Sequence, residues 1–188
     1  MNRETYCAYD HEGRRKYLTH EEGRRFLKCA RRCPVAEALF CMTIYYTGMR
    51  ISEALALTGQ DIDHSTGTVR IRSLKKRQLR VFRRIPLPDR LLSGLTQLHC
   101  DAPDAALWKF SRTTGWRVIK RVMHEAEITG IHATTKGLRH GFGIRGALAK
   151  IPLNLLQYWF GHSQSSTTAI YLDVKDAEER ALIRRTWK

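Results

Sequence analysis

The sequence has no long apolar run and no biased block. No stretch of about 18 apolar residues occurs, and the first residues lack the apolar core of a signal peptide, so nothing argues for membrane insertion or export. Glycine-rich, proline-rich and repeated segments are also missing, which excludes a low-complexity or solenoid chain. We therefore expect a cytoplasmic globular protein.

Cysteine is scarce and irregularly placed. The five cysteines are an odd number, which fits reduced thiols better than a disulfide framework. Cys29, Cys33 and Cys41 stand in apolar helical segments without a paired CxxC spacing. Four histidines also lack ligand spacing to carboxylates or thiols: His124, His132, His140 and His162. We expect no metal site.

Acidic residues are outnumbered by basic ones. Thirty-three Lys and Arg face 18 Asp and Glu, a formal charge of +15, which indicates a polyanionic partner, either nucleic acid or an anionic membrane surface. Between Arg70 and Arg90 the apolar residues follow no helical stripe, so this segment favours a basic β-hairpin and a nucleic-acid partner. The segment holds a single acid, Asp89, and nine bases: Arg70, Arg72, Lys75, Lys76, Arg77, Arg80, Arg83, Arg84 and Arg90.

The 188 residues, 43% of them hydrophobic, predict one mainly α domain with a small antiparallel β-sheet, an α+β fold. A capping box of Thr19 and Glu22 opens the first helix. The run 35–46 is apolar nearly all round, as in a buried helix, and Gly48 ends it. Expected helices span 19–32, 35–46, 50–58, 89–99, 113–128, 135–150, 152–160, 165–174 and 176–186, and the hairpin strands span 68–74 and 79–87.

Polar residues stand beside sharp structural breaks at several places. Arg50 begins a helix after Gly48, with Glu53 one turn later, which fits either a phosphate contact or a surface ion pair. Lys75 and Lys76 fall near the hairpin tip, where an ammonium could enter a groove beside a nucleic-acid backbone; read alone, the pattern favours solvated loop lysines. Lys76 and its neighbours Arg77, Arg80, Arg83 and Arg84 are candidate DNA contacts.

Two further segments hold candidate residues. In "TTKGLRHGFG", Lys136 and Arg139 share a polar helical face, with His140 beside them; a solvated basic face fits almost as well. In "WFGHSQSSTTAIY", His162 follows a helix-ending glycine and Tyr171 follows nine residues later. A tyrosine of the core near a capping histidine is the plain alternative.

Together these places resemble the tyrosine recombinase (integrase) family over about 18–174. Its catalytic domain carries an Arg, a hairpin Lys, a His or Lys followed by Arg, a His or Trp, and a Tyr nucleophile. The residues that match in order are Arg50, Lys75, Lys136, Arg139, His162 and Tyr171. Many members have histidine where this chain has Lys136. The style of "GMRISE" and "IRSLKK" is similar to short fimbrial-switch recombinases that lack an N-terminal core-binding domain.

The resemblance implies a site-specific recombinase that cleaves double-stranded DNA through a 3′-phosphotyrosyl link at Tyr171, for integration, excision, inversion or resolution. Arg50, Arg139 and His162 would hold the phosphate, and Lys75, with Lys76 as fallback, would protonate the leaving 5′-oxygen. Lys136 would assist at the phosphate or with the tyrosine proton. Glu53 and His140 would support these residues, and no cofactor or metal is required.

We expect an N-terminal arm at 1–17, a catalytic domain at 18–174 and a tail helix at 175–188. The tail docks either on a neighbouring subunit or on its own domain. The implied partners are a homotetramer on paired sites, joined through a Holliday junction, and DNA-bending accessory proteins, in the bacterial nucleoid. Two alternatives stay open: a non-catalytic DNA-binding accessory or regulatory protein, and a type IB topoisomerase-like relaxase.

Overall fold

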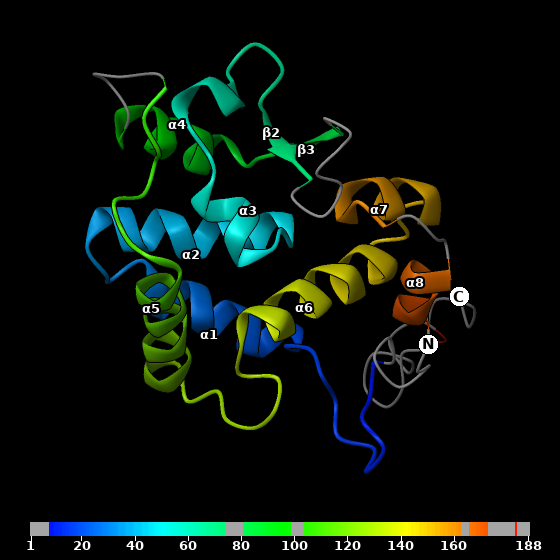
Figure 1. Cartoon of the computed structure of the whole chain (residues 1–188). Coiled ribbons are helices and arrows are strands. Elements are labelled where there is room, and N and C mark those ends of the chain that lie inside the picture. The colour runs from blue at the N-terminus through cyan, green and yellow to red at the C-terminus, as the bar shows by residue number, and fades with distance from the viewer. Residues whose placement is uncertain (1–7, 74–80, 99–103, 163–165, 173–182, 184–188) are drawn as a thin grey trace.

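A computed structural model describes residues 8–73, 81–98, 104–162, 166–172 and 183 of the chain (Figure 1). The described part is mostly helical with one small sheet, so the expected fold class is confirmed. Six helices lie where the sequence predicts them: α1 (His20–Ala30), α2 (Val35–Thr47), α4 (Asp89–Leu98), α5 (Arg112–Glu125), α6 (Thr135–Leu148) and α7 (Leu153–Phe160). Not one described helix combines the length and apolar character needed to cross a bilayer.

Among the described residues, the sheet has three antiparallel strands in the order β1 (Ile62–Asp63), β2 (Thr68–Arg72) and β3 (Phe82–Pro86). The expected hairpin pairs Arg70 with Arg84. β1 is an addition that the sequence analysis did not foresee, because two residues are too few to show a period of two. Since strand side chains alternate between faces, one face of the hairpin is buried and the other is exposed.

The remaining helical segments are short. α3 (Ile51–Leu55) is followed by the 3₁₀ turn η2 (Gly59–Asp61), whereas one helix was expected at 50–58. The single helix expected at 165–174 is instead α8 (Ser166–Ala169) followed by the 3₁₀ turn η3 (Ile170–Leu172). The tail helix expected at 176–186 lies outside the described residues, apart from Ile183.

The main core surrounds α2, which is buried on nearly every side because its sequence is apolar all round. The helices α1, α4, α5 and α6 pack against it (Figure 1). Gly48 ends α2 with φ of +60°, and a side chain there would also strike the ring of Phe142. The capping box of Thr19 and Glu22 is present at the start of α1, as predicted.

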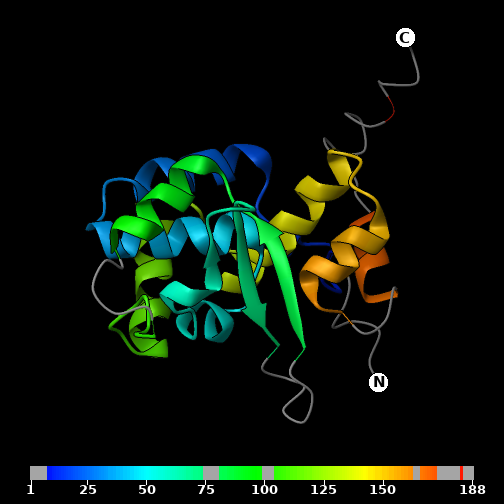
Figure 2. The same cartoon turned by 90° about the horizontal axis from the view of Figure 1, so that it is seen from above.

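A smaller core lies on the far side of α6 from α2 and includes the ring of Tyr171. Figure 2 shows α7 and α8 gathered on this side, away from α1, α4 and α5. The core residues are Ala8, Tyr17, Ile144, Leu156, Phe160 and Tyr171. The expected arm at 1–17 is therefore packed rather than loose in its described part, because Ala8 and Tyr17 are each 1% exposed.

Candidate active site

Arg50 and Glu53 form a fixed pair at the start of α3. The Glu53 carboxylate accepts the backbone N–H of Arg50 at 2.8 Å and a guanidinium N–H of the same residue at 3.0 Å. Glu53 is 2% exposed, whereas the Arg50 side chain is 29% exposed. One alternative from the sequence was a surface ion pair, but the Glu53 side of this pair is buried. The pair leaves the Arg50 side chain partly exposed and fixes its orientation.

Arg83 corrects one DNA-contact prediction. Its guanidinium donates to both Glu53 carboxylate oxygens, at 2.7 and 3.3 Å, and its Nε donates to the carbonyl of Trp159 at 2.6 Å. Arg83 is 3% exposed because it points to the buried face of β3, the face that also carries Ile85. It therefore supports Glu53 from inside the protein instead of facing DNA. We call Arg50, Glu53 and Arg83 the arginine cluster.

The Glu53 carboxylate remains ionised in this cluster. Burial alone would raise the pKa of Glu53, but the hydrogen bonds and charge of Arg83, with those of Arg50, hold its pKa below the ordinary value. The Glu53 carboxylate and the Arg83 guanidinium stabilise each other in this buried place, because burying one of these charges without its partner would be costly.

Arg139 connects the arginine cluster to the aromatic side of the site. Its guanidinium donates to the carbonyls of Gly48 at 2.7 Å and Phe160 at 2.9 Å, and it lies 4.6 Å above the Phe160 ring. Burial, followed by the charge of Arg50, lowers the pKa of Arg139 to about 9. Arg139 therefore stays cationic at neutral pH, beside Arg50.

His162 is held as a neutral imidazole by two hydrogen bonds. Nε2 lies 3.1 Å from Nη2 of Arg139, and Nδ1 lies 2.9 Å from Oγ1 of Thr168. Because a guanidinium only donates, Nε2 must accept, which leaves the ring proton on Nδ1. Burial, with the nearby charges of Arg139 and Arg50, lowers the pKa of His162 to about 3. Gly161, with φ of +62°, makes the turn that places this ring flat on Phe160.

Tyr171 is buried beside both candidate arginines. Its ring stacks on Phe160 with centroids 4.9 Å apart, and it lies against Gly143, where an added Cβ would approach three ring atoms to 2.6 Å. Burial raises the pKa of Tyr171 to about 12, against the opposing pull of Arg139 and Arg50. The phenol is thus protonated at rest, and both cations act on it. We call His140, Phe160, His162 and Tyr171 the aromatic cluster.

The other predicted site residues differ in burial, and some lie outside the described part of the chain. Lys136 is exposed in the first turn of α6, and His140 is buried one turn later, with its ring 5.8 Å from that of Tyr171. Arg84 is exposed on β3, where its backbone N–H donates to the Tyr158 hydroxyl at 3.0 Å. The remaining hairpin residues lie outside the described part of the chain: Lys75, Lys76, Arg77 and Arg80.

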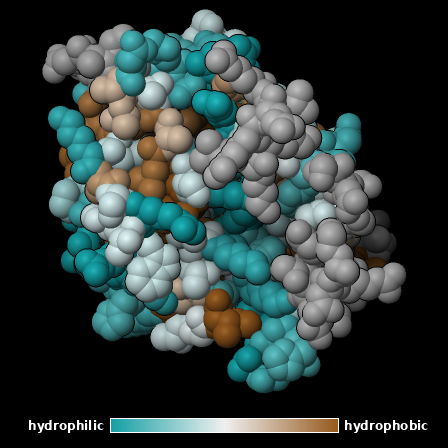
Figure 3. All heavy atoms as spheres, in the orientation of Figure 1, coloured by the Kyte–Doolittle hydropathy of each residue, from teal (hydrophilic) through white to brown (hydrophobic). Residues whose placement is uncertain are grey.

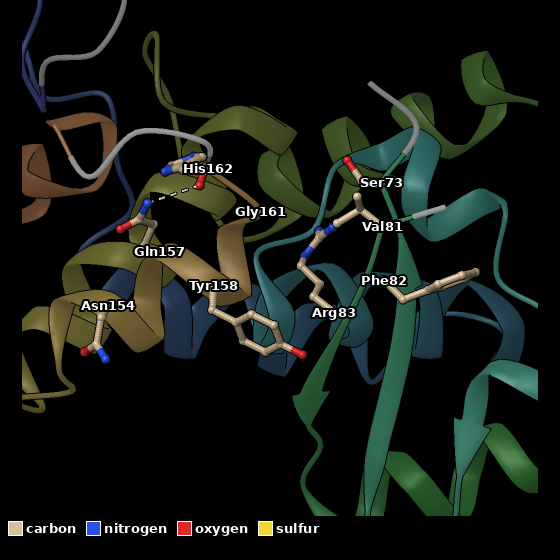
Figure 4. A pocket seen from close by; sticks show the side chains of 9 residues that line it. All are labelled: Ser73, Val81, Phe82, Arg83, Asn154, Gln157, Tyr158, Gly161 and His162. Carbon is tan, nitrogen blue, oxygen red and sulfur yellow. Dashed lines mark hydrogen bonds between the residues drawn. The ribbon is translucent and has the colours of Figure 1, made fainter. Parts of the chain in front are cut away.

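A pocket of about 270 Å³ opens between the hairpin and α7, with His162 at one end (Figure 4). Arg83 lines it from β3 and Gln157 from α7, and the Gln157 amide donates to the His162 carbonyl at 3.3 Å. The other lining residues are Ser73, Val81, Phe82, Asn154, Tyr158 and Gly161. In Figure 3, hydrophilic side chains cover much of the visible face. Within the described ranges, no three His, Cys, Asp or Glu side chains are grouped as metal ligands would be.

Comparison with known proteins places this geometry in a family. The model of the phage integrase family matches residues 16–178. The chain belongs to the phage integrase family. The tyrosine recombinase XerA of Pyrococcus furiosus is 30% identical over 182 residues, which cover 88% of this chain and 62% of that protein. The chain therefore spans less than two thirds of this curated relative.

Two solved structures share the fold of this family member. A crystal structure of XerA recombinase superposes with a TM-score of 0.78 at 21% identity, over 92% of this chain and 65% of the other. XerH site-specific recombinase bound to its difH substrate gives 0.73 at 20% identity, over 98% and 62%. The predicted membership and fold are confirmed. The narrower likeness to fimbrial-switch recombinases stays a prediction.

Three residues contribute to the site of this integrase-family chain in ways that the sequence did not predict. Arg83 supports Glu53, Phe160 supplies the surface on which His162 and Tyr171 stack, and Thr168 fixes the His162 tautomer. The alternation along β3 was a usable signal, because Arg83 stands two residues before the apolar Ile85 and so shares its face. No local signal marks Phe160 or Thr168.

Proposed function

We propose that this chain is the catalytic part of a site-specific DNA recombinase, which cleaves and rejoins strands through a 3′-phosphotyrosyl link at Tyr171. One observation carries the proposal: residues from four separate segments converge on one place. Arg139 bonds His162 at 3.1 Å and the carbonyl of Gly48, two residues before Arg50. The charges of Arg50 and Arg139 both act on the Tyr171 phenol.

The arrangement suits phosphoryl transfer to a phenol. Negative charge grows on the non-bridging oxygens of a phosphodiester as it is attacked, and two guanidiniums stabilise that charge. Arg50, oriented by Glu53, and Arg139 supply them, and His162 adds a hydrogen bond. A covalent tyrosyl phosphate keeps the energy of the broken bond, so the strand can be resealed without ATP. Lys75 is the candidate donor of a proton to the leaving 5′-oxygen, and Lys136 assists the phosphate or the tyrosine.

The exposed face of the hairpin is the candidate DNA surface beside this site. Arg72 and Arg84 are exposed there, and Arg70 lies over the ring of Phe82 at 5.2 Å on the same face. Exposed guanidiniums bind phosphates and displace counterions, which gives affinity without reading sequence. We propose Lys76, Arg77 and Arg80, which stand between β2 and β3 in the sequence, as further DNA contacts.

The assembly follows from the reaction. Exchange between two DNA sites needs four cleavages, so we propose a homotetramer on paired sites and a reaction that passes through a Holliday junction. We also propose DNA-bending accessory proteins as partners, and the bacterial nucleoid in the cytoplasm as the location. Support comes from XerH, which was solved on its difH substrate. The limits proposed for the domains stay 1–17, 18–174 and 175–188.

Trapping the covalent intermediate tests the function. The chain is incubated with a pool of nicked duplexes that carry randomised half-sites, so that cleavage releases a short strand and religation fails. An adduct that survives SDS is the expected result, and sequencing its DNA identifies the site. Tyr171→Phe should remove the adduct while leaving the buried ring in place.

Tyr46→Phe is the matched control, because Tyr46 is a partly buried tyrosine of α2 whose ring packs on Tyr45 rather than on the proposed site residues. It should form the adduct normally. An adduct that survives Tyr171→Phe would place the nucleophile elsewhere. DNA binding without any adduct would favour the accessory-protein alternative, and relaxation of supercoils without exchange would favour the topoisomerase-like alternative.

A further inference from the structure

His140 is a buried imidazole with no hydrogen bond. It is 7% exposed, and within the described ranges neither ring nitrogen has a partner. Its ring packs against that of Tyr171, with centroids 5.8 Å apart and planes inclined by 59°. Buried polar atoms are nearly always paired in folded proteins, so two unpaired nitrogens beside a candidate nucleophile call for an explanation.

Burial and the surrounding positive charges keep His140 neutral. Burial, with the nearby charges of Lys136, Arg139 and Lys16, lowers the pKa of His140 to about 4. The titratable groups that face it are Lys136 and Arg139 on its own helix, Lys16 from the N-terminal segment, Tyr171 from η3 and His162 from the turn after α7. At neutral pH it therefore presents one N–H and one free lone pair.

The proposed reaction needs a proton acceptor, and the other candidates are poor ones. The phenol of Tyr171 is protonated at rest and must lose its proton when it attacks. His162 uses Nε2 to accept from Arg139 and Nδ1 to donate to Thr168. A lysine ammonium and a guanidinium carry donors only, so Lys136 and Arg139 cannot take the proton in their charged forms.

We propose that His140 accepts the phenol proton of Tyr171 during DNA cleavage. This inference rests on the proposed function. The Tyr171 O–H bond breaks as an N–H bond forms on His140. The phenolic oxygen bonds to phosphorus, and the bond from phosphorus to the 5′-oxygen breaks, with that oxygen protonated by the general acid. Resealing runs the same steps backwards.

DNA binding would itself prepare His140 for this role. A phosphodiester bound by Arg50 and Arg139 brings a negative charge that offsets Arg139, one of the three cations that oppose protonation of the imidazole. The bound phosphate therefore raises the pKa of His140 and makes it a better base than in the free protein. Tyr171 lies in the same core, with its ring against those of His140 and Phe160, so the proton donor and the proposed acceptor are neighbours.

Single-turnover cleavage of the nicked duplex recovered above tests the inference. His140→Phe keeps a ring of similar size but removes both nitrogens, and His140→Gln keeps hydrogen-bonding atoms without a basic one. Both should bind DNA as the wild type does and form the adduct about 100-fold more slowly or worse. His140→Phe should melt at the same or a higher temperature, because it removes unpaired buried nitrogens. A merely structural role for His140 predicts the opposite result: the variants would be less stable than the wild type but would form the adduct at the wild-type rate.

Chemical rescue makes the result independent of folding. His140→Ala leaves space beside Tyr171, so added imidazole should restore adduct formation in this variant but not in Tyr171→Phe. The rescued rate should rise with pH as imidazole loses its proton. Wild-type speed in His140→Phe, or a slow His140→Ala that imidazole does not restore, would overturn the inference. Absence of an adduct in the wild type would instead defeat the proposed function.

Discussion

The two halves of the candidate site are held together by different forces. In the arginine cluster, the Glu53 carboxylate is shared by two guanidiniums at 2.7 to 3.3 Å, and every contact is a directional, charge-assisted hydrogen bond. In the aromatic cluster, Tyr171 is held by ring stacking on Phe160 and by contact with Gly143. The first half is suited to present a phosphate site of fixed geometry, and the second seats the nucleophile by side-chain packing alone.

Removing the Glu53 charge should have the largest effect on this comparison. Glu53→Gln leaves Arg50 and Arg83 facing each other in a buried place without the carboxylate that neutralises them. Breaking a buried ion pair by removing one partner costs about 3–5 kcal/mol. Urea unfolding should therefore show a loss of about this size in the free energy of unfolding.

The matched control for this variant is Glu21→Gln. Glu21 pairs with Arg24 at 3.3 Å in the first turns of α1, but both side chains are more than 60% exposed. An exposed pair contributes about 0–1 kcal/mol, so this change should alter stability little. Equal effects of the two substitutions would mean that the arginine cluster is not the fixed half of the site.

A methyl group at Gly143 should break the aromatic half by a smaller amount. The added Cβ of Gly143→Ala would lie 2.6 Å from three ring atoms of Tyr171, so the ring must move. Overpacking of this kind costs about 1–3 kcal/mol, of which the helix preference of alanine over glycine offsets about 1 kcal/mol. The free energy of unfolding should fall accordingly, and adduct formation should change further because the nucleophile is displaced.

Gly94→Ala is the matched control, a glycine-to-alanine change in another helix. There the new Cβ meets the end of the flexible Leu39 side chain at 2.7 Å, which can rotate away. Alanine also favours a helix by about 1 kcal/mol over glycine, so the net effect should be near zero. A Gly143→Ala protein as stable and as active as Gly94→Ala would show that Tyr171 is not seated as described.

Only part of this fold could be predicted from the sequence. Helix limits followed from caps and apolar periodicity, as at Thr19, Glu22 and Gly48, because those signals are local. The two-residue strand β1 and the break between α8 and η3 were missed, since segments of two to four residues carry no readable period.

Within the site, two neighbouring residues of β3 differ from each other in burial. Arg83 and Arg84 were both expected at DNA, yet Arg83 turns inward to a carboxylate 30 positions earlier in the chain, while Arg84 is exposed. The identities of the candidate residues could be read from motifs. The burial of Tyr171 could not, because it depends on Phe160 and Gly143, which only the packing of α6 against α7 brings to it.

Acid should separate the two halves by the smallest of the expected effects. The pKa of His140 is about 4 in the folded chain and about 6.5 for an ordinary histidine, so between these values the unfolded chain binds a proton that the folded chain does not. Stability contributed by this group is therefore lost as pH falls below about 6.5. From pH 6 to pH 5 the loss is about 1 kcal/mol.

His140→Phe should abolish this part of the pH dependence of stability. Above pH 7.5 the stability curves of the variant and the wild type should be parallel, because residue 140 is then unprotonated in both the folded and the unfolded chain. Glu53 acts at lower pH, since its lowered pKa preserves the arginine cluster until the solution is well below pH 4.5. Parallel curves of the two proteins between pH 7 and pH 5 would show that His140 has the same pKa in the folded and the unfolded chain, and the acid sensitivity of the aromatic half would then rest on His162.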